Sequence, residues 1–284
     1  MSYLDSTTIE IIRSDLPRGR MRSALFDFDG TLSLIREGWQ GVMIPMMVEI
    51  LLKTPQHEGE EELHAVVTEY VERLTGEQTI YQMIQLAEEV ARRGGQPLDP
   101  VAYKRQYHDR LWGRIAGRVA ALKAGQIAPD DMLVPCARVF LEALRARGVT
   151  CYLASGTDEP FVRDEVNALG LADYFAAIYG AREDYLRATK KRVIEHILRR
   201  HDLRGEEFVA FGDGYVEIEN AKSAGGLAVG VASDEVERRG VNAWKRERLI
   251  RAGADVIVPD FREHEKLIAY LLDPGLETRQ VSET

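Results

Sequence analysis

The chain has 284 residues, 45% of them hydrophobic, and a formal net charge of −9 at pH 7, so its length allows one large domain or two smaller ones. The acidic balance argues against general DNA or RNA binding, which requires a basic surface, but a small anionic substrate could still bind in a local cationic pocket. No run of eighteen apolar residues occurs, so we expect no membrane span, and the first ten residues lack the basic and apolar regions of a signal peptide.

The first predicted buried strand ends in two acidic side chains. Residues 9–12 form a short apolar stretch that is a candidate edge strand, and residues 25–33 then read LFDFDGTLS. Asp27 and Asp29 are two residues apart, so on an extended chain they share a face. Two like charges there are costly unless a cation or a reaction requires them.

Residues 36–129 are predicted to form a helical insert. Several helical patterns occur there without a convincing strand, separated by stretches rich in glycine and proline. We therefore expect a core domain built from residues 1–35 and 130–284, with a helical domain between its two parts.

The rest of the chain alternates short apolar strands with helical patterns. The predicted strands are 149–155, 176–180, 207–213, 227–232 and 255–260. The clearest helices cover residues 135–147, 158–169 and 190–200. This alternation predicts an α/β fold with a Rossmann-like core, in which helices cover both faces of a parallel sheet.

Polar side chains follow three of these strands at the same end. Asp27 and Asp29 follow the first, Ser155 ends the second, and Asp213 ends a third. Ligands of an open parallel sheet bind outside the carboxyl ends of its strands, so we expect one crevice to contain all four side chains. Three carboxylates there suit Mg²⁺, which takes few protein oxygens and completes its octahedron with a phosphate.

The same crevice is predicted to bind a phosphate. Ser155 and nearby backbone N–H groups at a helix start would hold its oxygens, and Lys190 or Lys191 would neutralise charge on the transferring group. An aspartate nucleophile that forms an aspartyl-phosphate would divide phosphoryl transfer into two steps.

The ordered set resembles the four motifs of the haloacid dehalogenase-like (HAD) superfamily over residues 22–34 and 133–260. DFDGT is similar to the first motif, with Asp27 at the nucleophile position and Asp29 at the acid/base position. The other three resemble, in order, ASGT with Ser155 and Gly156, TKKRVI with Lys190 in the usual place of the lysine, and GDGYVEIENAKSAG with Asp213 as a metal ligand.

The resemblance implies a phosphatase with a helical cap inserted after the first motif. Asp27 would attack the phosphorus of a small phosphomonoester, and Asp29 would protonate the leaving oxygen and then activate water. Mg²⁺ would lie between Asp27, the main-chain carbonyl of Asp29, Asp213 and the phosphate. Thr31 is expected to support the phosphate site by orienting Asp29, while the cap closes over the substrate and selects it.

One position departs from the family pattern. The fourth motif usually has a second aspartate four residues after the first, and here that residue is Glu217. The longer side chain would act on the metal through a bound water, and Glu219 is the alternative.

The helical insert contains a possible substrate-selecting stripe. Arg110, Arg114 and Arg118 are spaced four residues apart, which places them on one side of a helix. The stripe is either a solvated face or an anion clamp, since a guanidinium suits a carboxylate or a second phosphate. Arg36 and Trp39, at the start of the insert, are either hinge residues or further substrate contacts.

Other readings of the same residues remain open. A phosphomutase would share every core residue and pass the phosphoryl group to a sugar hydroxyl instead of water. A dehalogenase would need neither a metal nor a second aspartate, so Asp29 argues against it, and a binding module should lack a catalytic residue. The sequence does not determine the oligomeric state.

The two cysteines indicate a reduced setting. Cys151 lies in the apolar run VTCYLAS and is predicted to be a small buried side chain, and with Cys136 as the only other cysteine a disulfide framework is not expected. We therefore predict a cytoplasmic protein whose partner is a small phosphorylated metabolite, with no nucleic acid and no membrane.

Overall fold

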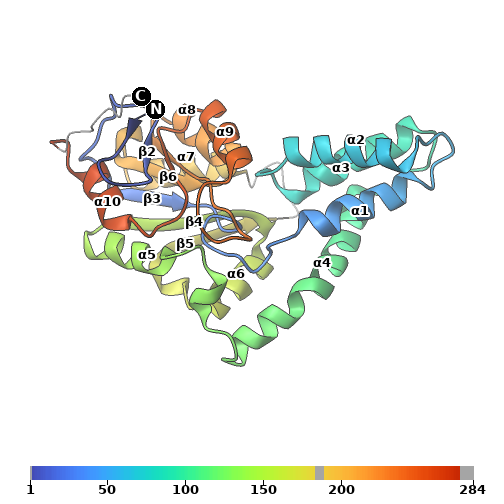
Figure 1. Ribbon diagram of the computed structural model, residues 1–284, viewed down its shortest axis with the longest axis horizontal. Helices are drawn as coiled ribbons and strands as arrows, with labels where there is room; N and C mark the ends of the chain where they lie inside the picture. Colours follow the sequence, from blue (N-terminus) through green and yellow to red (C-terminus); the bar gives the residue numbers. More distant parts are fainter. Residues whose placement is uncertain (1, 183–188, 276–284) are drawn as a thin grey trace.

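An eight-stranded sheet forms the centre of the molecule in the computed structural model, which describes residues 2–182 and 189–275 (Figure 1). Its strands are β1 Ser2–Tyr3, β2 Glu10–Ile11, β3 Ser23–Phe26, β4 Thr150–Asp158, β5 Phe175–Ala181, β6 Phe208–Gly212, β7 Leu227–Val231 and β8 Val256–Val258. They lie in the order β1-β2-β8-β7-β6-β3-β4-β5. Strands β3 to β8 are parallel, which confirms the predicted parallel sheet, and the candidate edge strand at 9–12 is β2, antiparallel to β8.

Helices cover both faces of this sheet, as the continuous apolar strands require. They are α5 Ala137–Ala146, α6 Glu159–Ala168, α7 Lys190–Arg200, α8 Tyr215–Ser223, α9 Ala243–Arg251 and α10 His264–Leu272. In Figure 1, α5 and α6 lie on one face and α7, α8 and α9 on the other. Every residue of β3, β6 and β7 is buried between these layers.

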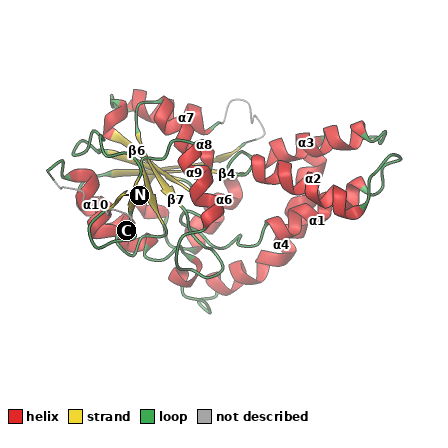
Figure 2. Cartoon of the chain, turned by 45° about the horizontal axis from the view of Figure 1, so that its top comes forward, coloured by secondary structure: helices red, strands yellow, loops and turns green. Residues whose placement is uncertain are grey.

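The helical insert, residues 36–129, contains four helices and, within that fully described range, no strand. They are α1 Gln40–Leu51, α2 Glu60–Arg73, α3 Thr79–Arg92 and α4 Pro100–Lys123. Figures 1 and 2 show them projecting from one side of the sheet, away from the described chain ends. The division into two separate domains stays a prediction.

Helix α4, the longest in the described chain, shows how the insert is encoded. Asp99 caps it by accepting a hydrogen bond from the Val101 amide at 2.7 Å, and Pro100 occupies the first turn, where its missing N–H costs nothing. Its buried side chains recur every three or four residues: Tyr103, Tyr107, Leu111, Ile115, Val119 and Leu122. No described helix is both long and apolar enough to cross a membrane.

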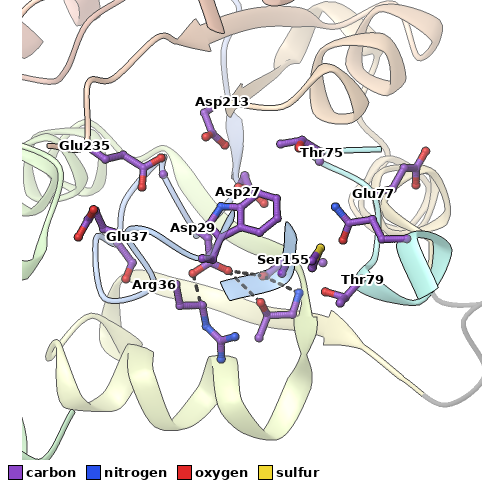
Figure 3. A pocket seen from close by; sticks show the side chains of 18 of the residues that line it. Asp27, Asp29, Arg36, Glu37, Thr75, Glu77, Thr79, Ser155, Asp213 and Glu235 are labelled. Atoms are coloured by element: carbon purple, nitrogen blue, oxygen red, sulfur yellow. Dashed lines mark hydrogen bonds and ion pairs between the residues drawn. The ribbon is translucent and has the colours of Figure 1, made fainter. Parts of the chain in front are cut away.

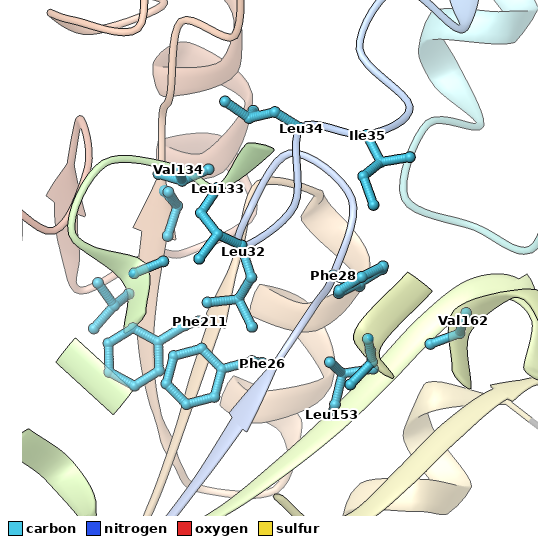
Figure 4. Close-up of a cluster of buried hydrophobic side chains, with 14 of the residues drawn as sticks. Phe26, Phe28, Leu32, Leu34, Ile35, Leu133, Val134, Leu153, Val162 and Phe211 are labelled. Carbon is cyan, nitrogen blue, oxygen red and sulfur yellow. The ribbon is translucent and has the colours of Figure 1, made fainter. Parts of the chain in front are cut away.

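Aromatic packing holds the strand that carries the two aspartates. The rings of Phe26 and Phe211 are nearly parallel, with centroids 4.7 Å apart (Figure 4). The ring of Phe140 stacks on that of Phe261 with centroids 4.6 Å apart. The loop after β3 is fixed by buried apolar side chains on both sides of its turn: Phe28, Leu32, Leu34 and Ile35. This anchoring keeps the polar end of β3 in place, because a packed interior resists displacement.

We expect Phe140→Ala to lower the free energy of unfolding by about 3–5 kcal/mol, because it opens a cavity among three packed rings. Denaturant unfolding would measure the loss. The adjacent Val139, which is 43% exposed on the same helix, provides the control, and Val139→Ala should change stability by about 0.5 kcal/mol or less. Equal effects of the two substitutions would contradict the assigned core.

Candidate active site

The polar residues predicted at the strand ends meet in one cavity of about 100 Å³. Asp27, Asp29, Ser155, Lys190 and Asp213 all line it, next to the carboxyl ends of β3, β4 and β6. Residues 75–77 and 79 of the helical insert form another part of the wall (Figure 3). The parallel sheet therefore brings together side chains that lie more than 180 residues apart in the sequence.

Lys190, and not Lys191, reaches the cavity. Its Nζ donates a hydrogen bond to Oδ1 of Asp27 at 2.7 Å and contacts the carboxylate of Glu217. Lys190 is the first residue of α7 and is buried, whereas Lys191 is exposed. Glu217 is also buried while Glu219 is exposed, so Glu217 is the acidic residue of α8 that belongs to the site.

Asp29 is held from three directions. The Thr157 hydroxyl donates to its Oδ2 at 2.9 Å, the Ser155 hydroxyl lies 3.5 Å from the same oxygen, and Nε of Arg36 lies 3.7 Å from Oδ1. These contacts fix one orientation of the carboxyl group next to Asp27 (Figure 3).

Burial raises the pKa of both Asp27 and Asp29 to about 6. For Asp27 the Lys190 ammonium opposes this increase in pKa, and the negative charge of Asp213 adds to it. For Asp29 the guanidinium of Arg36 opposes the increase. A carboxyl group with a pKa near neutrality can both donate and accept a proton in a reaction.

The donor set fits a hard divalent cation. Asp27 and Asp213 lie at the ends of adjacent strands and repel each other, and Mg²⁺ is commonly held by only one or two carboxylates plus water and substrate phosphate. Within residues 2–182 and 189–275, no three His, Cys, Asp or Glu side chains are arranged to hold a metal. An ion here would therefore depend on water or substrate oxygens for its remaining ligands. The Glu217 carboxylate contacts Lys190.

Thr31 has a different partner from the predicted one. Its hydroxyl accepts a hydrogen bond from the Asp213 amide at 3.0 Å, and the side chain is fully buried and does not line the cavity. Thr31 therefore holds Asp213, and the prediction that it orients Asp29 was wrong, whereas its support of the phosphate site stays a prediction. The neighbouring Gly30 has a φ of +77°, and a Cβ there would collide with the Asp213 carboxylate.

Asp213 has a second, unpredicted contact. Nζ of Lys245 lies 2.8 Å from Oδ2 of Asp213 and 2.7 Å from Oε1 of Glu235. Lys245 is buried on α9, and Glu235 lines the cavity from the loop before that helix.

The chain after Ser155 does not form the start of a helix. Strand β4 continues to Asp158 and α6 begins only at Glu159. The Thr157 amide donates to the Ser155 hydroxyl at 3.0 Å, and Gly156 lines the cavity with both neighbours. The helix predicted at 158–169 is therefore confirmed as α6, and Ser155 and Gly156 belong to the end of the strand that precedes it.

Arg36 and Trp39 both line the cavity. The guanidinium of Arg36 is already engaged, because it donates to Glu165 at 2.6 and 3.1 Å and both side chains are buried. Arg36 therefore contributes a paired charge next to Asp29.

The arginine stripe of α4 does not face the cavity. Arg118 donates to the carbonyl of Ile35 at 2.9 Å and to the carboxylate of Glu37 at 3.0 Å. Arg110 lies 2.8 Å from Glu49 of α1, and the guanidinium of Arg114 packs against Gly38. The three arginines hold the start of the insert, so the anion-clamp interpretation, including Arg114 as a substrate contact, was wrong.

Sequence reasoning missed four side chains around the aspartates: Thr157, Glu165, Glu235 and Lys245. Thr157 has a sequence signal, since it lies two residues after Ser155 and shares its side of an extended strand. The other three have none, because each meets its partner only through the tertiary fold.

We expect Arg36→Met to destabilise the protein by about 3–5 kcal/mol, because it leaves the Glu165 carboxylate buried without its partner. The double variant Arg36→Met, Glu165→Met should recover most of this loss in denaturant unfolding, since removing a whole buried pair is often nearly neutral. The exposed pair Arg73 and Glu69 is the control, and Arg73→Met should cost about 1 kcal/mol or less. A double variant no more stable than Arg36→Met would contradict this account.

The chain is similar to known proteins of one hydrolase family. Residues 21–225 match the family model for haloacid dehalogenase-like hydrolases. A 5'-nucleotidase from Pseudomonas aeruginosa is 33% identical over 92 residues, which cover 32% of this chain and 42% of that protein. A phosphoglycolate phosphatase from Yersinia pseudotuberculosis is 27% identical over 108 residues, or 38% of this chain and 47% of the relative. The chain thus spans less than half the length of these two curated relatives.

A solved structure shares the fold. The crystal structure of a predicted phosphoglycolate phosphatase from Haemophilus somnus superposes with a TM-score of 0.59 at 18% identity, covering 87% of this chain and 98% of that one. At that identity the likeness concerns the fold alone.

Proposed function

The chain belongs to the haloacid dehalogenase-like hydrolases, and we propose that it is a Mg²⁺-dependent phosphatase that hydrolyses a small phosphomonoester through an aspartyl-phosphate. The observation that carries this proposal is the pairing of Asp27 with Lys190 at 2.7 Å, beside the partly buried carboxyl group of Asp29. A nucleophile, a fixed cation and a proton donor thus share one small cavity.

In the first step a carboxylate oxygen of Asp27 forms a bond to phosphorus, and the bond from phosphorus to the leaving oxygen breaks. Lys190 is placed to neutralise charge on the transferring phosphoryl group, as fixed electrostatic groups do in transition states. Protonated Asp29 gives its proton to the leaving oxygen, and a pKa of about 6 makes that proton available near neutral pH.

In the second step water attacks the phosphorus of the aspartyl-phosphate. Asp29, now ionised, takes a proton from the water, the bond between Asp27 and phosphorus breaks, and phosphate leaves. Thr157 and Arg36 keep the Asp29 carboxyl group in one orientation through both steps, because Thr157 contacts its Oδ2 and Arg36 its Oδ1.

Asp27, Asp213 and the main-chain carbonyl of Asp29 would hold Mg²⁺. When bound, the ion supplies positive charge that stabilises the transferring phosphoryl group and orients the substrate. Thr31 holds the backbone amide of Asp213, and Lys245 holds its carboxylate.

The helical insert supports a closed reaction cavity. The Gly76 carbonyl lies 3.5 Å from Nζ of Lys190, and the backbone of Gly76 packs directly against Gly214. We propose that this segment excludes bulk water and contacts the leaving group.

The direct test is phosphate release from p-nitrophenyl phosphate and a panel of phosphomonoesters, with Mg²⁺ or with EDTA. We expect release with Mg²⁺ and none with EDTA, and at least about a 10³-fold loss in Asp27→Asn, since an amide is a poor nucleophile. The melting temperature of the variant should be no lower, because one charge leaves a crowded site. Substantial activity in Asp27→Asn would overturn the mechanism, and dependence on an added bisphosphate would favour a phosphomutase.

Lys190→Met and Lys191→Met form a matched pair of adjacent substitutions. The first should reduce kcat about 10²–10³-fold, as for removal of other fixed transition-state donors. The second should be nearly silent because its side chain is exposed. The assigned role fails if the two variants have similar rates of phosphate release.

A further inference from the structure

The cavity has an unusual balance of charge for a site that binds phosphate. Six acidic and two basic side chains line it among the described residues: Asp27, Asp29, Glu37, Glu77, Asp213 and Glu235 against Arg36 and Lys190. A bound divalent ion would offset only the charge of an incoming phosphate dianion. The rest of the lining therefore stays acidic when substrate is present.

Neither lining cation is available to a second anionic group. Arg36 is engaged by Glu165 at 2.6 Å, and Lys190 lies 2.7 Å from Asp27, where the transferring phosphoryl group arrives. Because both are buried and paired, turning either toward another part of the substrate would leave a buried carboxylate unpaired.

The cations that pair with lining carboxylates from outside the cavity are themselves already engaged. Arg118 pairs with Glu37 at 3.0 Å, and Lys245 pairs with Asp213 and Glu235. Two further buried acids, Glu165 and Glu217, offset these two cations. With these four side chains included, eight acids stand against four cations in this set.

The other lining side chains suit hydroxyl groups. Thr75, Thr79 and Gln82 come from the helical insert, and Trp39 and Tyr107 add aromatic surface. In Figure 3, Glu37 and Glu235 lie on one side of Asp29, and Thr75, Glu77 and Thr79 lie on the opposite side. Carboxylate and amide oxygens accept hydrogen bonds from hydroxyl donors, so both walls can bind an uncharged polyol.

Resting on the proposed function, we infer that the leaving group is uncharged and hydroxylated, as in a short polyol or small sugar phosphate, and that substrates with a second anionic group are rejected. The cavity of about 100 Å³ is also smaller than the roughly 300 Å³ at which pockets for larger ligands begin. This substrate class differs from phosphoglycolate, whose carboxylate would face the acidic lining without a free cation among the described residues.

Two pairs of substrates isolate the second charge. Glycerol 3-phosphate and 3-phosphoglycerate differ by a hydroxymethyl group in place of a carboxylate, and 2-hydroxyethyl phosphate and phosphoglycolate differ in the same way. At about 0.15 M ionic strength, kcat/KM should favour the uncharged member of each pair by at least about tenfold, since like charges in a closed site repel. Equal values, or a preference for the carboxylates, would overturn this inference.

p-Nitrophenyl phosphate distinguishes failure of the inferred substrate class from failure of the proposed phosphatase function. If it is hydrolysed with Mg²⁺ but the anionic substrates are preferred, only the inferred substrate class fails. If neither it nor any of the four matched substrates releases phosphate, the proposed function fails and the inference fails with it.

Glu77 offers a test by mutation, because its only described side-chain hydrogen bond is accepted from the Tyr215 hydroxyl at 3.3 Å, which glutamine can also accept. Glu77→Gln should reduce the preference for glycerol 3-phosphate over 3-phosphoglycerate at least about threefold, and Glu77→Lys should reduce it further. The control is Glu69→Gln, which changes the charge equally at an exposed side chain of α2. It should leave the ratio of the two kcat/KM values within about twofold. An unchanged ratio in both Glu77 variants, with unchanged melting temperatures, would overturn the role of the acidic lining.

Discussion

Negative charge partly withdrawn from water at the ends of parallel strands is the constraint on which this structure depends. Asp27, Asp29 and Asp213 gather there because β3 and β6 are neighbours in the sheet. A carboxylate withdrawn from water is stable only when it is protonated or paired. Asp27 is buried, Asp29 and Asp213 are partly buried, and each of the three has a cation within 4 Å. The cations come from three separate parts of the chain, so the fold must be complete before the site is compensated.

The cations that pair with these carboxylates are themselves shared with other acids. Lys190 faces Asp27, where phosphoryl transfer is proposed. Each of the three cations is shared with a further acid: Lys190 with Glu217, Arg36 with Glu165, and Lys245 with Glu235. Sharing holds a cation in place and lowers the net charge it presents to a ligand. This is why a cavity with nearby lysine and arginine side chains can still present an acidic surface to the rest of the substrate.

The helical insert completes the cavity, and several described contacts fasten it to the core. Arg118 of α4 holds the backbone at Ile35 and Glu37, where the insert begins. Arg248 of α9 donates to the carbonyls of Arg73 and Thr75 at 2.8 and 2.9 Å, at the end of α2. The second contact lies next to the segment that lines the cavity, so the position of the wall depends on a residue of the core.

The sequence by itself determined the parallel strands of the core, the class of the sheet and the residues at the strand ends. Apolar runs with polar residues after them are local patterns, and in a parallel sheet the carboxyl ends of the strands lie at the same edge. It also indicated Lys190 as the first residue of a helix. Only the tertiary structure decided which side chains neutralise one another: Thr31 with Asp213, Arg36 with Glu165, and the α4 arginines with the start of the insert. The physical reason is that helix and strand periodicity set the direction of a side chain, whereas an ion pair forms only when two distant segments approach within a few ångströms.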